Sequence, residues 1–452
     1  MLSRSSAARL WPQRPPPCRP PLAIDDPNIP DTMNPEPGNR SRQARDAHQE
    51  PQTIPAAEWR RPSTDEASGA MDDARAILDR VKVEGDIAIT EYSQRFDGAA
   101  PEAIDLQPFE SYDLPPEASG AIRLAHDRIT RFAEMQRETY QNREFTDETG
   151  TYGQRIQPVA SVGAYIPGGR HPLVSTALMT LVPARVAGVE TRVAVSPSDD
   201  PAILAACSLA GATRFVRMGG AQAVGALAYG SGWAPKVDMI VGPGNAWVAA
   251  AKTLVQGVVG IDTVAGPSEV LVIAGPEADP TWLAWDLIAQ AEHDPLAFSV
   301  LVSWSEELLD RVRQRLAGLP EASGAVARGG IQLVLAEDEA DAIAFSDRMG
   351  PEHLHVHSDT LTPEAFTSYG SLFLGAESAV ALGDYVSGPN HTLPTGGYAA
   401  VKGGLSVGDF LRVLTWQRVT PSGLGIIGPA AAALADAEGL TGHAESVCQR
   451  LQ

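Results

Sequence analysis

Lysine, cysteine and long apolar runs are all scarce in this sequence, and each absence excludes something. Of 35 basic residues only four are lysines, and the 452-residue chain carries a net charge of −21. Such a chain lacks the positive surface that binds nucleic-acid phosphates or an anionic membrane. Its three cysteines, Cys18, Cys207 and Cys448, form neither a disulfide framework nor a CxxC metal motif, which fits a reducing cytoplasmic compartment. No run of about 18 apolar residues predicts a membrane span.

Residues 1–55 differ from the rest of the chain. They are rich in proline, arginine and small polar residues, a composition that buries too little apolar surface to fold. The sequence therefore predicts a disordered extension. The early arginines also resemble an organelle transit peptide. A start codon assigned too far upstream, with Met33 or a later residue as the true start, would account for the same segment.

From about residue 70 the pattern is typical of an α/β protein. Residues 70–140 carry apolar residues at helical spacing, and short apolar runs alternate with helices from residue 158 onward. This alternation predicts parallel sheets built from βαβ units, and a second series begins near residue 268. We expect two doubly wound, Rossmann-like domains, a helical N-terminal segment and a helical tail that packs on a partner subunit. The expected divisions are residues 56–157 with 266–400 (first domain), residues 158–265 (second domain) and residues 401–452 (tail).

Pro351-Glu352-His353-Leu354 places a carboxylate directly beside an imidazole. Adjacent residues of an extended segment point to opposite faces, so Glu352 and His353 could serve two different proton transfers around one substrate. The preceding proline restricts the backbone that leads into the pair. Taken alone, the pair favours a solvated surface, where most Glu-His pairs lie.

Glycine-rich loops follow several predicted strands. The loops are Gly163–Gly169, Gly219–Gln222 and Gly242–Asn245 after strands of the first series, and Gly266–Glu269 before the second series. Open parallel sheets bind ligands at the carboxyl ends of their strands, where glycine lets backbone N–H groups approach a phosphate. However, the Gly-x-Gly-x-x-Gly fingerprint of dinucleotide-binding proteins is absent. Each loop therefore also fits an ordinary turn.

Nitrogen and oxygen donors suited to zinc stand at separated positions. Gln290 and His293 share one helix face because they are three residues apart. Further donors are Asp384 and His391 in a loop of turn-forming residues, and Glu438 and His443 near the C-terminus. One set from Gln290, His293, Asp384 and His443 would suit a zinc ion with open positions for substrate.

A rival set of ligands is His353, His355 and His357, which alternate along one predicted strand and share a face. Side chains two apart on a strand lie about 6–7 Å from each other, so three in a row converge poorly on a single ion. We therefore assign no metal to this stripe and give His355 and His357 no role.

Many segments together resemble the histidinol dehydrogenase family over roughly residues 70–450. The matching segments, in family order, are GAYIPGG, PARVAGV, GGAQAVGALAYG, VGPGN, GIDTVAGPSEVLVIA, QAEHDP, PEHL, GDYVSGPNHTLPTGGYA, GLSVGDFL and EGLTGH. The resemblance implies a homodimeric enzyme that oxidises L-histidinol to L-histidine through two hydride transfers to NAD, as the last step of histidine biosynthesis. It also implies active sites shared between the two subunits.

The resemblance also assigns roles to individual residues. Zinc ligands are implied at Gln290, His293, Asp384 and His443, the last of these acting across the dimer interface. The acid–base pair is implied at Glu352 and His353. Substrate contacts are implied at Ser268, His391 and Glu438, alongside His353 and the zinc ligands. Contacts to the dinucleotide are implied at Tyr165, Gln222 and Asn245.

One loop departs from the family pattern. The family often has a Ser-Ser pair after Pro-Gly-Gly, whereas this chain reads Arg170-His171-Pro172-Leu173. Relatives that oxidise other small alcohols, including a sulfonated diol, carry a similar stretch. Such an alcohol is therefore the alternative substrate.

Overall fold

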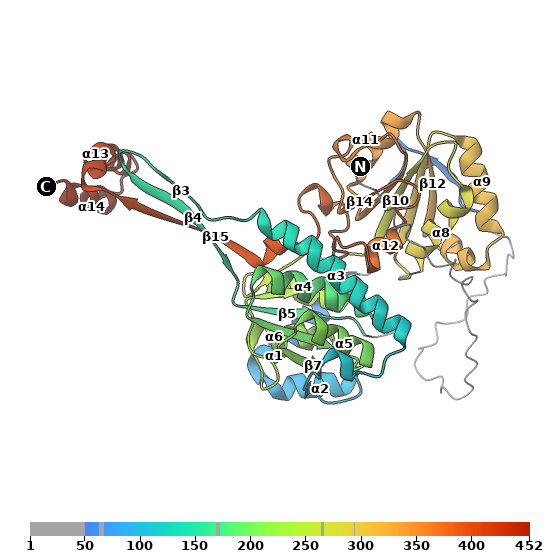
Figure 1. Cartoon of the computed structure of the whole chain (residues 1–452), viewed down its shortest axis with the longest axis horizontal. Helices are drawn as coiled ribbons and strands as arrows, with labels where there is room; N and C mark the ends of the chain where they lie inside the picture. The colour runs from blue at the N-terminus through green and yellow to red at the C-terminus, as the bar shows by residue number, and fades with distance from the viewer. Residues whose placement is uncertain (1–49, 63–66, 169–171, 264–265, 293) are drawn as a thin grey trace, which may run out of the picture. The chain divides into compact units, whose positions relative to one another are not determined.

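Alternating apolar strands and helices form two separate parallel sheets (Figure 1). The structure is a computed structural model that describes residues 50–62, 67–168, 172–263, 266–292 and 294–452. Within these ranges no helix is long and apolar enough to cross a membrane.

The first sheet has the strand order β2–β7–β6–β5–β8–β9. All its neighbours pair in parallel except β2, which runs antiparallel to β7. Its strands are β2 (Glu102–Ile104), β5 (Ser161–Tyr165), β6 (Thr191–Ser196), β7 (Arg214–Arg217), β8 (Met239–Val241) and β9 (Gly260–Ile261). From β7 to β9 this is the order of a dinucleotide-binding fold, in which the order of strand connections switches direction between the parallel strands β5 and β8.

Helices cover both faces of the first sheet because its strands are apolar on both sides. On β6, Ala194 faces one core, while Val193 and Val195 face the other. The first core is completed by α3 (Pro116–Glu138), α4 (Val174–Ala187) and α5 (Pro201–Ala210). The second is completed by α1 (Ala67–Glu84), α2 (Asp86–Phe96), α6 (Gly220–Tyr229) and α7 (Ala246–Val255).

The second sheet has the order β1–β12–β11–β10–β13–β14, with every neighbouring pair parallel. Its strands are β1 (Thr53–Pro55), β10 (Glu269–Ala274), β11 (Phe298–Ser303), β12 (Ile331–Leu335), β13 (His353–His357) and β14 (Ser371–Leu374). Val270 and Val272 pack with α8 (Pro280–Ala291) and α9 (Glu306–Ala317). Leu271 and Ile273, on the other face, pack with α11 (Glu339–Met349). In this sheet the order of strand connections switches direction between the parallel strands β10 and β13.

A third, antiparallel sheet has the order β15–β4–β3, from β3 (Arg143–Thr146), β4 (Gly150–Pro158) and β15 (Leu411–Val419). The chain ends in α13 (Pro421–Ala437) and α14 (Thr441–Leu451). Short helices elsewhere are η1 (Phe109–Ser111), η2 (Pro320–Ala322), α10 (Ser323–Ala327), η3 (Pro363–Ala365), α12 (Val380–Tyr385), η4 (Tyr398–Ala400) and η5 (Val407–Phe410).

Three sequence expectations need correction. Residues 53–55 belong to a strand rather than to the disordered extension, because β1 pairs with β12. The helices between residues 67 and 138 pack on the first sheet rather than with residues 266–400, since their apolar faces complete its two cores. The tail is not wholly helical, because the β-prone residues 411–419 pair with β4. The described residues form a single compact unit, so the expected boundaries at 158, 266 and 400 stay predictions.

Candidate active site

Glu352 and His353 lie where β13 begins, beside the start of β10. Both side chains are buried, with exposed fractions of 5% each. The Oε2 atom of Glu352 accepts a hydrogen bond from the backbone N–H of Glu269 at 2.8 Å. The pair is therefore a fixed part of the interior and not a solvated surface pair.

His353 stands between two carboxylates. Its Nδ1 lies 3.7 Å from Oε2 of Glu352, and its Nε2 lies 3.5 Å from Oδ1 of Asp384 on α12. The same Nδ1 is 3.4 Å from the carbonyl oxygen of Glu269. An imidazole held between two carboxylates has a path for a proton on either ring nitrogen.

The electrostatics of this pair favour retention of protons. Burial, with a smaller contribution from the charge of Asp384, raises the pKa of Glu352 to about 8 against the opposing effect of His353. Burial by itself lowers the pKa of His353, but Glu352 and Asp384 together raise it above its ordinary value. Glu352 can therefore change its protonation state in the pH range where acid–base catalysts work.

Glu269 and Arg61 support this pair, and the sequence analysis missed both. Arg61 forms an ion pair with the Glu269 carboxylate, which is 1% exposed. The other oxygen of Glu269 accepts a hydrogen bond from Gly396 N–H at 3.2 Å. The sequence did offer one signal for Glu269, which is the first residue of the apolar run EVLVIA. A carboxylate at the start of a fully buried strand needs a positively charged or hydrogen-bonding partner.

Asp384 and His391 belong to the same neighbourhood as His353. Asp384 lies on α12, and its backbone carbonyl accepts a hydrogen bond from Nδ1 of His391 at 2.8 Å. The Nε2 atom of His391 lies 3.4 Å from Oγ1 of Thr176 on α4. Gln290 occupies the end of α8 and is 3% exposed. His293, the expected ligand three residues further on, lies outside the described residues.

The remaining expected substrate and zinc positions are less enclosed. Ser268 is half-buried just before β10, and its carbonyl accepts a hydrogen bond from Phe298 N–H at 3.2 Å. Glu438 ends α13, and His443 lies in the first turn of α14; both are exposed. Among the described residues, no hydrogen bond or ion pair connects either of them to Glu352, His353 or Asp384.

The expected acid–base pair lies at the amino ends of β10 and β13, opposite to the edge that open parallel sheets ordinarily use. The three expected dinucleotide contacts instead lie at the carboxyl edge of the first sheet. Tyr165 ends β5, Gln222 lies in the first turn of α6, and Asn245 precedes α7.

Local hydrogen bonds fix these three residues. The hydroxyl of Tyr165 accepts from Gly220 N–H at 3.1 Å, and burial raises the pKa of that phenol to about 12. Gln222 is fully buried and donates through Nε2 to Asp97 at 3.2 Å. Asn245 caps α7, with Oδ1 accepting from Val248 N–H at 3.1 Å. Gln222 and Asn245 therefore also have structural functions.

A family model described as histidinol dehydrogenase matches residues 60–451. The chain belongs to the histidinol dehydrogenase family. It is 44% identical over 391 residues to the histidinol dehydrogenase of Aquifex aeolicus, covering 82% of this chain and 90% of that protein. It is 42% identical over 402 residues to a histidinol dehydrogenase homolog of Ruegeria pomeroyi, covering 85% of this chain and 93% of that protein.

The fold agrees with the family. A crystal structure of histidinol dehydrogenase from Elizabethkingia anophelis superposes with a TM-score of 0.80 at 33% identity, covering 90% of this chain and 99% of the other. The chain is thus a member of an oxidoreductase family of histidine biosynthesis. The name "homolog" given to the Ruegeria relative leaves room for different substrates within histidinol dehydrogenase-like proteins.

Proposed function

We propose that this protein oxidises L-histidinol to L-histidine through L-histidinal, with two successive hydride transfers to NAD. The observation that carries the proposal is the buried array of Glu352, His353 and Asp384. Each oxidation must remove a proton as the hydride leaves, so the site needs a base held against the substrate.

His353 acts as that base in both oxidations. Its ring sits between two carboxylates, which stabilise the imidazolium formed when it accepts the substrate hydroxyl proton. In the second oxidation the substrate is the hydrate of the aldehyde, and His353 accepts the hydroxyl proton of that hydrate. The proton then leaves through the carboxylates or to solvent.

Glu352 acts between the two oxidations. Water must add to the aldehyde before a second hydride can leave, and a carboxylate can remove a proton from that water. With a pKa of about 8, Glu352 is poised to hold a proton or release it within the working pH range. Glu352 thus takes the proton of the attacking water, and its neighbour His353 takes the hydroxyl protons of the substrate.

The residues fit a zinc ion. Asp384 offers a carboxylate beside His353, and Gln290 offers a buried carboxamide at the end of α8. Burial and the neighbouring charge of Asp384 both raise the pKa of Glu352, and a cation bound beside these two carboxyl groups would offset the negative charge there. Zinc held by Gln290, His293, Asp384 and His443 would bind and orient the substrate amine and imidazole without changing its own oxidation state. Ser268, His391 and Glu438 are proposed to contact the same substrate.

NAD is proposed to bind at the carboxyl edge of the first sheet, against Tyr165, Gln222 and Asn245. At that edge, the order of strand connections switches direction between β5 and β8, and such sheets bind nucleotides at this point. The glycines before α6 and the cap of α7 leave backbone N–H groups near two helix N-termini, which favours bound phosphate.

A homodimer with shared active sites in the cytoplasm completes the proposal. Exposed apolar residues on β15 and α13 support a covering partner, including Trp416 (38% exposed), Ile426 (54%) and Leu434 (67%). Glu438 and His443 are exposed in the same C-terminal part, which suits a contribution to the partner's site.

The proposal is tested by comparing NADH formation with L-histidinol and with dihydroxypropane-sulfonate, using zinc-loaded protein. We expect a higher kcat/KM for L-histidinol, and near-complete loss of activity in His353→Asn. The sulfonated diol is the second candidate because residues 170–173 read Arg-His-Pro-Leu, although residues 170 and 171 lie outside the described ranges. Absence of histidinol turnover with zinc present would overturn the main proposal.

A further inference from the structure

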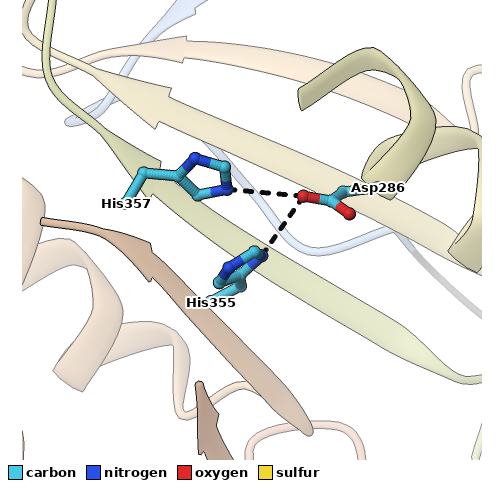
Figure 2. Close-up of side chains that lie close together, drawn as sticks. All are labelled: Asp286, His355 and His357. Atoms are coloured by element: carbon cyan, nitrogen blue, oxygen red, sulfur yellow. Dashed lines mark hydrogen bonds and ion pairs between the residues drawn. The ribbon is translucent and has the colours of Figure 1, made fainter. Parts of the chain in front are cut away.

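Asp286, His355 and His357 form a second cluster of metal-type ligands (Figure 2). Asp286 lies on α8, while both histidines lie on one face of β13. One ligand atom from each lies within 4.8 Å of the other two. The sequence analysis gave neither histidine a role, and the catalytic steps proposed above use none of the three.

The distances within this cluster match a coordination shell. Oδ2 of Asp286 lies 3.2 Å from Nδ1 of His355 and 3.4 Å from Nε2 of His357 (Figure 2). Around a tetrahedral zinc ion with bonds of about 2.0–2.1 Å, ligand atoms lie about 3.3 Å from one another. The shared carboxylate oxygen is thus already spaced from both nitrogens as a common ion requires.

The orientation of His355 strengthens the case. Its Nε2 lies 3.1 Å from the carbonyl oxygen of Gly375, and because a carbonyl only accepts, Nε2 carries the hydrogen. In the neutral ring, Nδ1 is then a bare lone pair that faces a carboxylate oxygen. This Nδ1 is buried and makes no hydrogen bond with any described residue, although Asp286 is close. A cation bound between Nδ1 of His355 and the carboxylate of Asp286 would remove the repulsion between these two acceptors. A metal-bound histidine usually donates its other ring N–H to a carbonyl or carboxylate, as Nε2 does here.

The charge of Asp286 agrees with this arrangement. Burial alone raises the pKa of this carboxyl, but the adjacent imidazoles of His355 and His357 lower it below its ordinary value. The group is therefore an anion at neutral pH. Its side chain is 15% exposed, against 0% for His355 and 2% for His357, so a solvent molecule can reach the ion from the side of Asp286.

We propose that Asp286, His355 and His357 bind a zinc-type divalent cation that links α8 to β13. Two imidazoles and one carboxylate suit first-row metals of intermediate softness, with zinc the probe of choice. Gln290 follows Asp286 by one helical turn, and His353 precedes His355 on the same strand. The ion would thus brace the two elements that carry the proposed catalytic groups, as a structural site separate from them.

The test is the zinc content of the full-length protein after stripping with a chelator, reloading with excess zinc and desalting. Wild-type protein should retain one more zinc equivalent per chain than either His357→Gln or Asp286→Asn. The matched control is His126→Gln, which removes an imidazole that also sits beside a carboxylate, 3.0 Å from Asp127, but has no third ligand among the described residues. This control should retain as much zinc as the wild type.

The outcomes separate this proposal from the catalytic zinc. One equivalent in the wild type and none in the two variants would support the second site and contradict the catalytic one. Equal zinc content in wild type and both variants would overturn the second site. Where a variant does not fold, anomalous diffraction from zinc-loaded wild-type crystals decides: a peak among the three side chains supports the site, and no peak there contradicts it.

Discussion

Glu352 is the residue for which burial has the clearest chemical consequence. Its pKa of about 8 lets it hold or release a proton close to neutral pH, where an exposed glutamate would be fully ionised. Water addition to the aldehyde needs Glu352 as a base, whereas the first oxidation uses it only to stabilise the imidazolium of His353. Glu352→Gln should therefore slow histidinal oxidation by about 10²- to 10⁴-fold while histidinol oxidation falls less. Single-turnover measurements started from each substrate check this. Equal losses in both steps would contradict the division of roles.

The same pKa predicts a dependence of stability on pH. Folded protein holds a proton on Glu352 between its ordinary value of 4.5 and about 8, a range in which the unfolded chain has released it. The stability contributed by this proton is complete below 4.5 and is lost as pH rises towards 8. In metal-free protein, the wild type should therefore lose stability relative to Glu352→Gln as pH rises from about 5 to 8. Denaturant unfolding at several pH values checks this, and parallel profiles for the two proteins would refute it.

Lys252 shows that the scarce lysines are not confined to the surface. Its side chain is 3% exposed, forms an ion pair with buried Asp262 and donates to the carbonyl of Gly242 at 2.8 Å. Lys252→Met leaves Asp262 as an uncompensated buried charge, which should cost about 3–5 kcal/mol of unfolding free energy. The matched control is exposed Lys236→Met, expected within about 0.5 kcal/mol of the wild type. Similar stabilities for the two variants would show that the buried pair does not stabilise the fold.

At the scale of elements, the loop between β8 and α7 is tied to the end of β5. Gly242 has φ of 109°, and a Cβ added there would lie 2.2 Å from the carbonyl oxygen of Tyr165. Gly188 has a similar φ of 94°, but its added Cβ would meet nothing closer than 3.7 Å. Replacing either glycine would therefore strain the backbone. Only at Gly242 would the new Cβ also clash with a backbone atom.

Comparison of Gly242→Ala with Gly188→Ala separates these two effects. Gly188→Ala should cost about 1–3 kcal/mol from backbone strain alone. Gly242→Ala should cost more and weaken NAD binding, because the clash displaces Tyr165 and the start of α7. Denaturant unfolding and NAD titration provide the measurements. An equal loss of stability with unchanged NAD affinity would contradict the proposed position of NAD.

Sequence patterns predicted individual helices and strands better than they predicted which of these elements pack together. Alternating strands and helices were sufficient for two parallel sheets, because fully buried strands read as continuous apolar runs. The same patterns could not place α1, whose apolar face would suit either sheet. Nor did they identify β15, which pairs with β4 across more than 250 residues of sequence. Long-range pairing leaves little trace in local periodicity.

The candidate site shows the same limit. The pair Glu352–His353 was identifiable because its two residues are adjacent in sequence and match a family motif. Glu269 and Arg61 support it from distant segments, so no spacing rule could connect them. His355 and His357 were set aside because three histidines on one strand converge poorly. Their actual partner, Asp286, comes from a helix that the strand pattern does not include.

At the scale of the whole molecule, the exposed C-terminal elements support a dimer in which each site borrows residues. Mixing a His443→Ala chain with a Glu352→Ala/His353→Ala chain should therefore restore activity, because a mixed dimer contains one intact site. Each variant alone should be nearly inactive, which provides the control. Subunits must be unfolded and refolded together to exchange. No recovery in a mixture that contains mixed dimers would contradict a shared site.

The central claim is that one active site carries out a four-electron oxidation of histidinol. The most direct measurement is the amount of NADH formed when a limiting, known quantity of L-histidinol is consumed to completion with excess NAD. The account predicts two NADH for each histidinol, with L-histidine as the product. One NADH with an aldehyde product, or no NADH at all from zinc-loaded protein, would contradict it.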